Sequence, residues 1–553
     1  MHPAAESSHA KGRSPCTTAS PSLTGGISPW LVLVMVVALA LAVWPTLSYP
    51  LTRDQGAYAY IADLIRQGGV PYRDVWDLKP PAIYWMYSLS FSLLGRSELA
   101  VRGFDVLYTL ATGAFVYLLA QEAFSDRRIA IGSAWLYAFG YHWFLHYYSL
   151  ANPESFMAPY LLVAAWGLSR GLRCRDLRCM LVGGFAGGLA FWFKPTAGLT
   201  VLVLCCWLWV SAFRGSDAKI SLGKATLALA VGAASALLVG VAALYGRGLS
   251  ELVQLWRTYG SASYVGARGL ALGDGPLAVA EVILGYVSDW QLLIWPTGAA
   301  VWSILRCWLR RQDGQSGRMT VVALLGATLG MVFVQGKYFE YHWIPVLAPA
   351  SILTSFAVVT VWEECRSGVS RLSRPGMSCA FVIMTIAGLL ALSASDRLAD
   401  YRRTVAHARG VLSDEAYYAA FDIGKDFSHV GSIAAASYIR QHTSADDTVL
   451  IWGAEPLVNF LAARRSPTKY IFSYMLRCDQ EDRRCEERRR DLMDEVQSKP
   501  PLYVALVDND ANPLSPAGSR SELTQFPSLS QWIDSDYRFE NQVDDYLFLR
   551  RKA

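Results

Sequence analysis

The chain has 553 residues, of which 53% are hydrophobic and 17% are charged, and its mean hydropathy is +0.25. This composition is too apolar for an ordinary soluble enzyme, so it favours an integral membrane protein. The net charge of +5 is small. Because the arginines gather in short loops rather than on one basic face, nucleic acid is not an expected partner.

The N-terminal segment, residues 1–28, is rich in Ser, Pro, Ala and Gly. Such a composition is typical of disorder, and we place the segment in the cytoplasm. The apolar run from Trp30 to Leu47 that follows is long enough to cross a bilayer and lacks a small-x-small cleavage site. It is therefore predicted to be an uncleaved anchor rather than a signal peptide.

The next apolar run, Ala82 to Leu94, has only about thirteen residues, whereas a spanning helix needs about twenty. Treating it as a span would place Arg127 and Arg128 outside, against the tendency of basic short loops to stay in the cytoplasm. We therefore predict that it lies at the membrane surface. Residues 48–103 then form one long outer loop.

With that choice, the other basic short loops all face the cytoplasm. Their basic residues are Arg170, Arg173, Arg175, Arg178, Arg214, Lys219, Lys224, Arg306, Arg310, Arg311, Arg318, Arg366, Arg371 and Arg374. The pattern predicts roughly eleven spans within residues 29–395. Residues 396–553 are then an extracytoplasmic soluble domain.

The C-terminal part alternates helical and strand signals, which predicts a small α/β domain. The signals are a helix at Ile433–Arg440, a strand at Thr448–Trp452, a charged helix at Glu481–Val496 and a strand at Leu502–Val507. The segment carries no nucleotide loop or catalytic triad, so we expect a recognition or docking role. Cys478 and Cys485 lie close together there, and both a local disulfide and free thiols are open alternatives.

The long outer loop contains the residues best suited to chemistry, because loops of this length usually carry function. It contains Arg53 and Asp54 at the start of an amphipathic stretch. Glu154, in the turn after the third span, is predicted to lie on the same side of the membrane. A carboxylate pair suits group transfer, with one acid as general base and the other orienting the acceptor or holding a divalent metal. The alternative is that both are solvated loop acids.

A lysine in the same loop, Lys79, is followed by two prolines. At the membrane surface its charge can stabilise a departing phosphate, and simple snorkelling is the alternative. Lys194, in the turn Phe193-Lys194-Pro195-Thr196, can serve in the same way. Arg257 and Arg268, in a later outer loop, are further candidates.

Two histidines, His142 and His146, are four residues apart near the outer end of the third span. On one helix face they could bind a metal. Their aromatic neighbours favour an interfacial belt instead.

Taken together, these residues resemble the GT-C glycosyltransferases, and more narrowly the group of protein mannosyltransferases, aminoarabinose transferases and Rgt-like enzymes. The resemblance covers about residues 29–395. It implies a helical polytopic membrane enzyme with an extracytoplasmic site. Such an enzyme moves a sugar from a polyprenyl-phosphate donor to a protein, lipid or glycan acceptor, usually with inversion.

The resemblance also implies roles for individual residues. Asp54 matches the catalytic acid of the first loop, and Glu154 matches the acid of the second. The implied donor- and substrate-binding residues are Arg53, Lys79, Lys194, Lys337, Tyr338 and His342. Gln55 stands where mannosyltransferases commonly have a second acid, so the use of a divalent metal as cofactor is left open.

Two other classes of protein are alternatives to this interpretation. A transporter or flippase for a lipid-linked substrate commonly shows an internal repeat and broken helices at mid-membrane, and the sequence shows neither. A non-catalytic membrane scaffold whose working part is the C-terminal domain has no need of Asp54.

Overall fold

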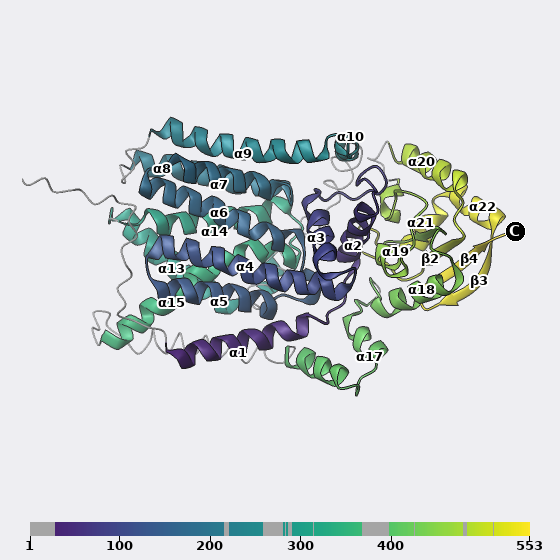
Figure 1. Ribbon diagram of the computed structural model, residues 1–553, viewed down its shortest axis with the longest axis horizontal. Coiled ribbons are helices and arrows are strands. Elements are labelled where there is room, and N and C mark those ends of the chain that lie inside the picture. Colours follow the sequence, from purple (N-terminus) through teal and green to yellow (C-terminus); the bar gives the residue numbers. More distant parts are fainter. Residues whose placement is uncertain are drawn as a thin grey trace, which may run out of the picture.

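The computed structural model describes residues 28–214, 221–257, 280–281, 284–285, 290–312, 314–367, 397–424, 426–478, 484–512 and 514–552. A bundle of long helices and a small α/β domain lie end to end, with helices α2 (Arg53–Arg66) and α3 (Ala82–Leu94) between them (Figure 1). The elements that join the two parts are therefore those of the long first loop.

Six stretches in the described part of the chain are long and apolar enough to cross a membrane. They are Pro29–Thr46, Glu98–Phe124, Pro195–Phe213, Leu222–Leu244, Ser316–Gln335 and Glu340–Glu364. In the same order, the helices in these stretches are α1 (Pro29–Thr46), α4 (Glu98–Phe124), α8 (Gly198–Phe213), α9 (Leu222–Leu244), α14 (Ser316–Gln335) and much of α15 (Ile344–Ser367). Beside them run α5 (Arg127–Phe144), α6 (Pro153–Cys174), α7 (Leu177–Phe191) and α13 (Gln291–Leu309) (Figure 1). The last predicted span, ending near Leu392, lies outside the described residues, so the count of roughly eleven stays a prediction.

Helix α1 shows most clearly why the bundle needs lipid. It is apolar on all sides, and Trp30, Val34 and Val36 expose more than half of their surface. A helix that is hydrophobic all round is stable only when it is surrounded by protein or by hydrocarbon. The exposed face of α1 therefore fits the hydrocarbon core of a membrane.

Small residues let helices α7 and α9 approach closely, as is common between membrane helices. A β-carbon on Gly184 would lie 2.1 Å from the carbonyl oxygen of Leu229, and one on Gly232 would lie 2.2 Å from that of Leu181. Neither helix can therefore carry a side chain at these two positions, where the helices cross.

We predict that Gly184→Ala lowers the thermal stability of the purified protein, because the two helix backbones must move apart. Overpacking of this kind costs about 1–3 kcal/mol. Gly223→Ala, near the start of α9, is the matched control, since a β-carbon there meets nothing within 4 Å. Equal melting temperatures for the two variants in the same detergent would contradict the prediction.

Helix α3 has the bounds of the short apolar run in the sequence, and it lies across the end of the bundle beside α2 (Figure 1). Its ring of Phe91 stacks on Phe460 of the C-terminal domain at a centroid distance of 5.5 Å. In α2, a β-carbon on Gly56 would lie 2.5 Å from Cβ of Leu457. Both helices therefore pack directly against α19 (Pro456–Ala462).

The C-terminal domain is built on a four-stranded sheet with the order β1-β2-β4-β3. Its strands are β1 (Val449–Trp452), β2 (Tyr503–Val507), β3 (Tyr537–Val543) and β4 (Tyr546–Arg551), and the named helices are α17 (Asp414–Tyr418), α18 (His429–His442), α19, α20 (Cys485–Ser498), α21 (Ser519–Thr524) and α22 (Pro527–Asp536). Strands β1 and β2 are parallel, and the other two pairs are antiparallel. The sequence predicted β1, β2, α18 and α20, but not the last two strands.

Candidate active site

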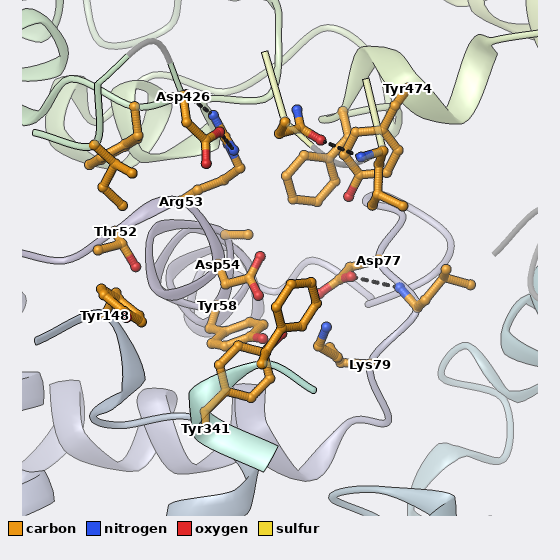
Figure 2. A pocket seen from close by; sticks show the side chains of 18 of the residues that line it. Thr52, Arg53, Asp54, Tyr58, Asp77, Lys79, Tyr148, Tyr341, Asp426 and Tyr474 are labelled. Atoms are coloured by element: carbon orange, nitrogen blue, oxygen red, sulfur yellow. Dashed lines mark hydrogen bonds and ion pairs between the residues drawn. The ribbon is translucent and has the colours of Figure 1, made fainter. Parts of the chain in front are cut away.

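A cavity of about 380 Å³ lies where the first loop, the ends of the bundle helices and the C-terminal domain meet (Figure 2). Its lining residues come from all three parts of the chain. They are Thr52, Arg53, Asp54, Ala57, Tyr58, Asp77, Leu78, Lys79, Tyr148, Lys337, Phe339, Tyr341, Ile423, Asp426, Phe427, Phe472, Tyr474, Asn512 and Leu514. The cavity therefore gathers four of the residues predicted from the sequence: Arg53, Asp54, Lys79 and Lys337.

The carboxylate of Asp54 projects into this cavity from the first turn of α2 (Figure 2). An acid is favoured there because the amide groups at the start of a helix carry partial positive charge. The residues on either side of Asp54 are anchored in different parts of the molecule. Arg53 contacts the C-terminal domain, and Gln55 is buried against the bundle.

Arg53 forms two ion pairs with the C-terminal domain. Its Nη1 lies 2.5 Å from Oδ1 of Asp426, and its Nη2 lies 2.7 Å from Oε1 of Glu455. Its Nε donates to the carbonyl of Ala454 at 2.9 Å. Burial raises the pKa of Glu455, and the Arg53 guanidinium beside it opposes the shift. The guanidinium that the sequence suggested for donor binding is thus committed to holding α2 on the C-terminal domain.

Gln55 is fully buried and joins two loops. Its Oε1 accepts from the backbone N–H of Thr52 at 3.1 Å and from Nη2 of Arg102 at 2.9 Å. Its Nε2 donates to the carbonyl of Leu150 at 2.5 Å, in the second loop. Where mannosyltransferases commonly have an acid, this chain uses an amide that needs both its donor and its acceptor.

We predict that Gln55→Met destabilises the protein by about 1–3 kcal/mol, because buried partners lose their hydrogen bonds. The volume is nearly conserved, so the effect reports on the polar contacts rather than on packing. Gln441→Met, at an exposed position on α18, is the control and should change the free energy of unfolding by less than about 0.5 kcal/mol. Similar melting temperatures for the two variants would show that the amide does not hold the loops.

Lys79 lies in a turn whose backbone is fixed by buried tyrosines. Its carbonyl accepts from the hydroxyl of Tyr72 at 2.8 Å, and the hydroxyl of Tyr84 lies 2.9 Å from Oδ2 of Asp77. Burial raises the pKa of Asp77, and the Lys79 ammonium opposes this shift. Asp77 and Lys79 both line the cavity, so a second acid and a cation stand beside Asp54 (Figure 2).

Lys337 brings a second ammonium to the cavity, from the segment between α14 and α15. Burial and the charges of Lys79 and Lys194 together lower its pKa to about 8, and Asp54 opposes this shift. The neighbouring Tyr338 is buried, and its ring packs at 6.0 Å on Phe333. Tyr338 is not part of the cavity lining.

Glu154 is fully buried and does not line the cavity. Its Oε1 forms an ion pair with the ammonium of Lys194 and lies 3.9 Å from Nε2 of His342. Lys194 lies 5.6 Å from the ring centroid of Tyr341, a cavity residue. Glu154, Lys194 and His342 thus form one buried cluster beside the cavity, and the ammonium of Lys194 is the nearest partner of the second acid.

The two histidines of the third predicted span do not share a helix face, because α5 ends at Phe144. His142 is buried with Nδ1 3.3 Å from Oγ1 of Thr46. His146 lies beyond the helix end, with Nδ1 2.8 Å from Oε1 of Glu340. Arg257 does not line the cavity, and Arg268 lies outside the described residues.

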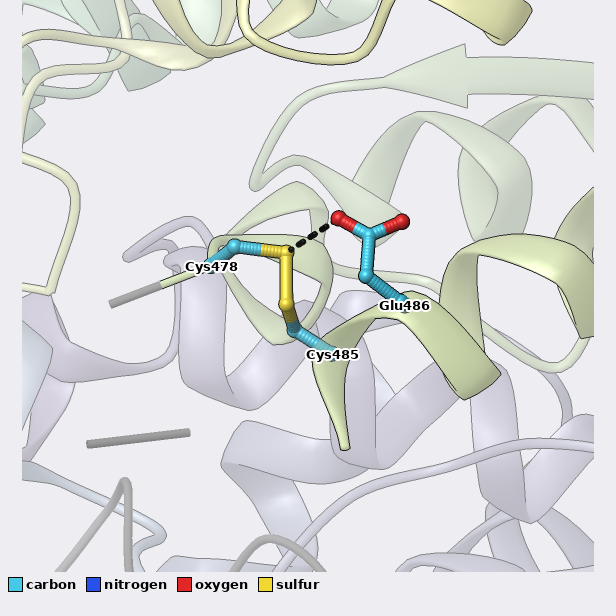
Figure 3. A group of neighbouring side chains, drawn as sticks. All are labelled: Cys478, Cys485 and Glu486. Carbon is cyan, nitrogen blue, oxygen red and sulfur yellow. Dashed lines mark hydrogen bonds between the residues drawn. A yellow bond between two sulfur atoms is a disulfide. The ribbon is translucent and has the colours of Figure 1, made fainter. Parts of the chain in front are cut away.

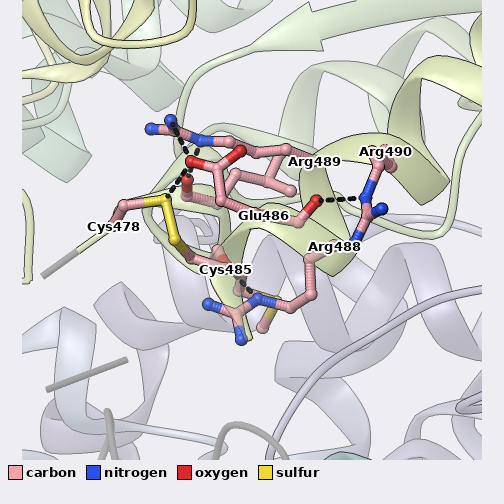
Figure 4. Close-up of a disulfide and its surroundings, with 8 residues drawn as sticks. Cys478, Cys485, Glu486, Arg488, Arg489 and Arg490 are labelled. Atoms are coloured by element: carbon pink, nitrogen blue, oxygen red, sulfur yellow. Dashed lines mark hydrogen bonds and ion pairs between the residues drawn. A yellow bond between two sulfur atoms is a disulfide. The ribbon is translucent and has the colours of Figure 1, made fainter. Parts of the chain in front are cut away.

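Cys478 and Cys485 form a disulfide, with Cα atoms 5.2 Å apart, at the start of α20 (Figure 3). Together with Glu486 they make the one group of three metal-ligand side chains found among the described residues. A metal-binding cysteine must be a thiolate, and sulfurs bonded to each other are not. We therefore assign the group a structural role. Arginines of α20 lie around the disulfide bond (Figure 4).

Sequence reasoning missed the contribution of the C-terminal domain to the cavity. Asp426, Tyr474 and Asn512 lie more than 370 residues after Asp54 in the chain, and no motif marks them. Tyr58, by contrast, is one helical turn after Asp54 on α2. That spacing places both residues on one helix face, a signal that was available in the sequence.

Solved structures of membrane glycosyltransferases share this fold. ArnT from Cupriavidus metallidurans in the apo state aligns with a TM-score of 0.56 over 94% of this chain and 97% of its own, at 13% identity. The same protein bound to undecaprenyl phosphate gives 0.52 over 96% and 99%, at 13% identity. The oligosaccharyltransferase of Archaeoglobus fulgidus, in complex with Zn and sulfate, gives 0.51 over 86% and 68%, at 13% identity. These likenesses confirm the predicted fold class, a helical GT-C membrane domain followed by a small α/β domain.

The sequence comparisons add a similarity to membrane glycosyltransferases over part of the chain. The family model described as dolichyl-phosphate-mannose-protein mannosyltransferase matches residues 78–239, a range that includes Lys79, Glu154 and Lys194. A stretch of 161 residues is 28% identical to the undecaprenyl phosphate-alpha-4-amino-4-deoxy-L-arabinose arabinosyl transferase of Photorhabdus laumondii. It covers 27% of this chain and 29% of that relative.

Proposed function

We propose that the protein transfers a sugar from a polyprenyl-phosphate donor to a hydroxyl or amine of a protein, lipid or glycan acceptor. The observation that supports this most directly is the cavity, which puts the carboxylate of Asp54 together with the ammonium groups of Lys79 and Lys337. Relatives with this fold include an undecaprenyl-phosphate-bound structure. We place the reaction on the extracytoplasmic side of the membrane, as the distribution of basic loops predicts.

In the proposed step, Asp54 accepts the proton of the acceptor O–H or N–H as the acceptor atom attacks the anomeric carbon. The bond between that carbon and the phosphate oxygen breaks, and polyprenyl phosphate leaves with the bonding electron pair. Attack from the side opposite the leaving group inverts the anomeric configuration. A general base of this kind contributes a factor of about 10² to 10⁴ in rate.

Lys79 and Lys337 stabilise the leaving phosphate in this proposal. A phosphodiester gains negative charge as the glycosidic bond breaks, and fixed cations lower the free energy of that transition state. The turn holding Lys79 is fixed by hydrogen bonds to its backbone. Its ammonium therefore needs little reorganisation during the reaction.

Five residues predicted from the sequence act around this centre rather than in it: Arg53, Glu154, Lys194, Tyr338 and His342. Arg53 holds α2 against the C-terminal domain. Lys194 adds positive charge behind Tyr341. We propose that the C-terminal domain, which supplies one wall of the cavity, helps to select the acceptor.

We predict that Asp54→Asn lowers the rate of sugar transfer by about 10² to 10⁴-fold, because the amide cannot accept the proton. Binding of polyprenyl-phosphate sugar to the purified variant should change less than about threefold. Asp74→Asn, an exposed acid of the same loop, is the control and should keep wild-type transfer. Transfer at the wild-type rate by a folded Asp54→Asn protein would overturn the assignment. Donor movement between leaflets without transfer would identify a flippase.

The lowered pKa of Lys337 predicts a fall in kcat/KM above about pH 8. Below this pH the side chain is a cation that attracts the donor phosphate, and above it the charge is lost. The pH profile of kcat/KM reports groups of the free enzyme. In Lys337→Arg the charge persists, so the alkaline fall should move up by at least one pH unit. An unchanged fall in this variant would show that another group is responsible.

A further inference from the structure

The Glu154 carboxylate is buried beside the cavity without lining it. Its side chain is 1% exposed, and that of Lys194 is 16% exposed. Oε1 of Glu154 contacts the Lys194 ammonium, while Oε2 has no hydrogen-bond partner among the described residues. An unpaired buried carboxylate is very costly, so Glu154 needs a cation.

In enzymes that use carboxylates for group transfer, the cation beside a buried carboxylate can be a divalent metal. The oligosaccharyltransferase with this fold was solved with Zn. A divalent ion of the kind that prefers oxygen ligands needs several of them at about 2.0–2.6 Å. Among the described residues, no three acidic, histidine or cysteine ligand atoms converge beside the cavity. Because the Lys194 ammonium already contacts Oε1 of Glu154, the residues present do not fit a divalent metal there.

We infer that Lys194 is a built-in cation that takes the place of a divalent metal at Glu154. The inference rests on the proposed transfer reaction. The lysine begins the short helix η2 (Pro195–Ala197), in the turn that joins α7 to α8, and Glu154 begins α6. Two turns on different helices thus meet at one contact between opposite charges.

The same ammonium also acts on the cavity. Burial lowers the pKa of Lys194, Glu154 opposes this shift, and the charges of Lys79 and Asp54 contribute as well. Lys194 therefore lies within electrostatic range of the catalytic acid and of the lysine assigned to the leaving phosphate. Glu154 is then a positioning residue that holds Lys194, rather than an acid that touches the acceptor.

The inference is tested first by metal binding, which does not depend on sugar transfer. Wild-type protein, stripped with EDTA and titrated with Mn²⁺, should show no stoichiometric site by electron paramagnetic resonance. Lys194→Ala vacates the place beside Glu154 and leaves Nε2 of His342 near it, so the variant should gain one site there for a Mn²⁺ ion that completes its coordination with water. The double variant Lys194→Ala, Glu154→Gln should lose that site again. A stoichiometric site in the wild type that disappears in Glu154→Gln would overturn the inference.

Transfer activity provides the second readout. Wild-type activity should change less than twofold after chelation, and Lys194→Ala should lose at least tenfold and recover part of the loss in Mn²⁺. Lys194→Arg keeps a cation and serves as the folding control, while Lys224→Ala, an exposed lysine of α9, should change nothing. Loss of wild-type activity on chelation, restored by Mn²⁺, contradicts the inference. If no variant transfers sugar, the proposed function fails while the Mn²⁺ titrations still decide the role of Lys194.

Discussion

The site depends on one buried cation, Arg102, and on the backbone that must surround it. This residue is 1% exposed, and its Nε donates to the carbonyl of Tyr49 at 3.1 Å. Its Nη2 donates to the carbonyl of Pro50 at 2.5 Å and to Oε1 of Gln55. A buried charge without such partners would be severely destabilising. The chain entering α2 is therefore fixed, and so is the direction in which Asp54 projects.

The opposite side of α2 faces a second constraint, its contact with the C-terminal domain. Arg53 is paired with two buried or half-buried acids, and Gly56 lets α19 approach to a distance that no side chain would allow. Because removing one partner of a buried ion pair costs about 3–5 kcal/mol, the contact resists displacement of the domain. The domain supplies one wall of the cavity. Docking of the domain and placement of Asp54 are thus properties of the same helix.

Local signals in the sequence singled out Asp54 and Lys79, which both line the cavity, because a long polar loop between apolar runs can be recognised without knowing the fold. The same signals predicted the length of α3, because its apolar run ends where the helix ends. They could not show that Glu154 is paired with Lys194, since a contact between two turns depends on how the bundle helices pack. The partners of Arg53 in the C-terminal domain were unpredictable for the same reason, because nothing near Asp426 distinguishes it from a solvated acid.

The charges around the cavity suit an anion such as the phosphate of the proposed donor. Lys79 and Lys194 each lower the pKa of Lys337, so the three ammonium groups repel one another in the absence of ligand. Asp54 offsets part of the charge at Lys337, and Glu154 offsets part of it at Lys194, while burial favours the neutral form of Asp77. An anion placed among the lysines reduces the repulsion between the ammonium groups. The reduction grows as the anion gains negative charge. For the proposed transfer, such an arrangement would favour the departing phosphate over the phosphodiester from which it comes, which is what catalysis requires.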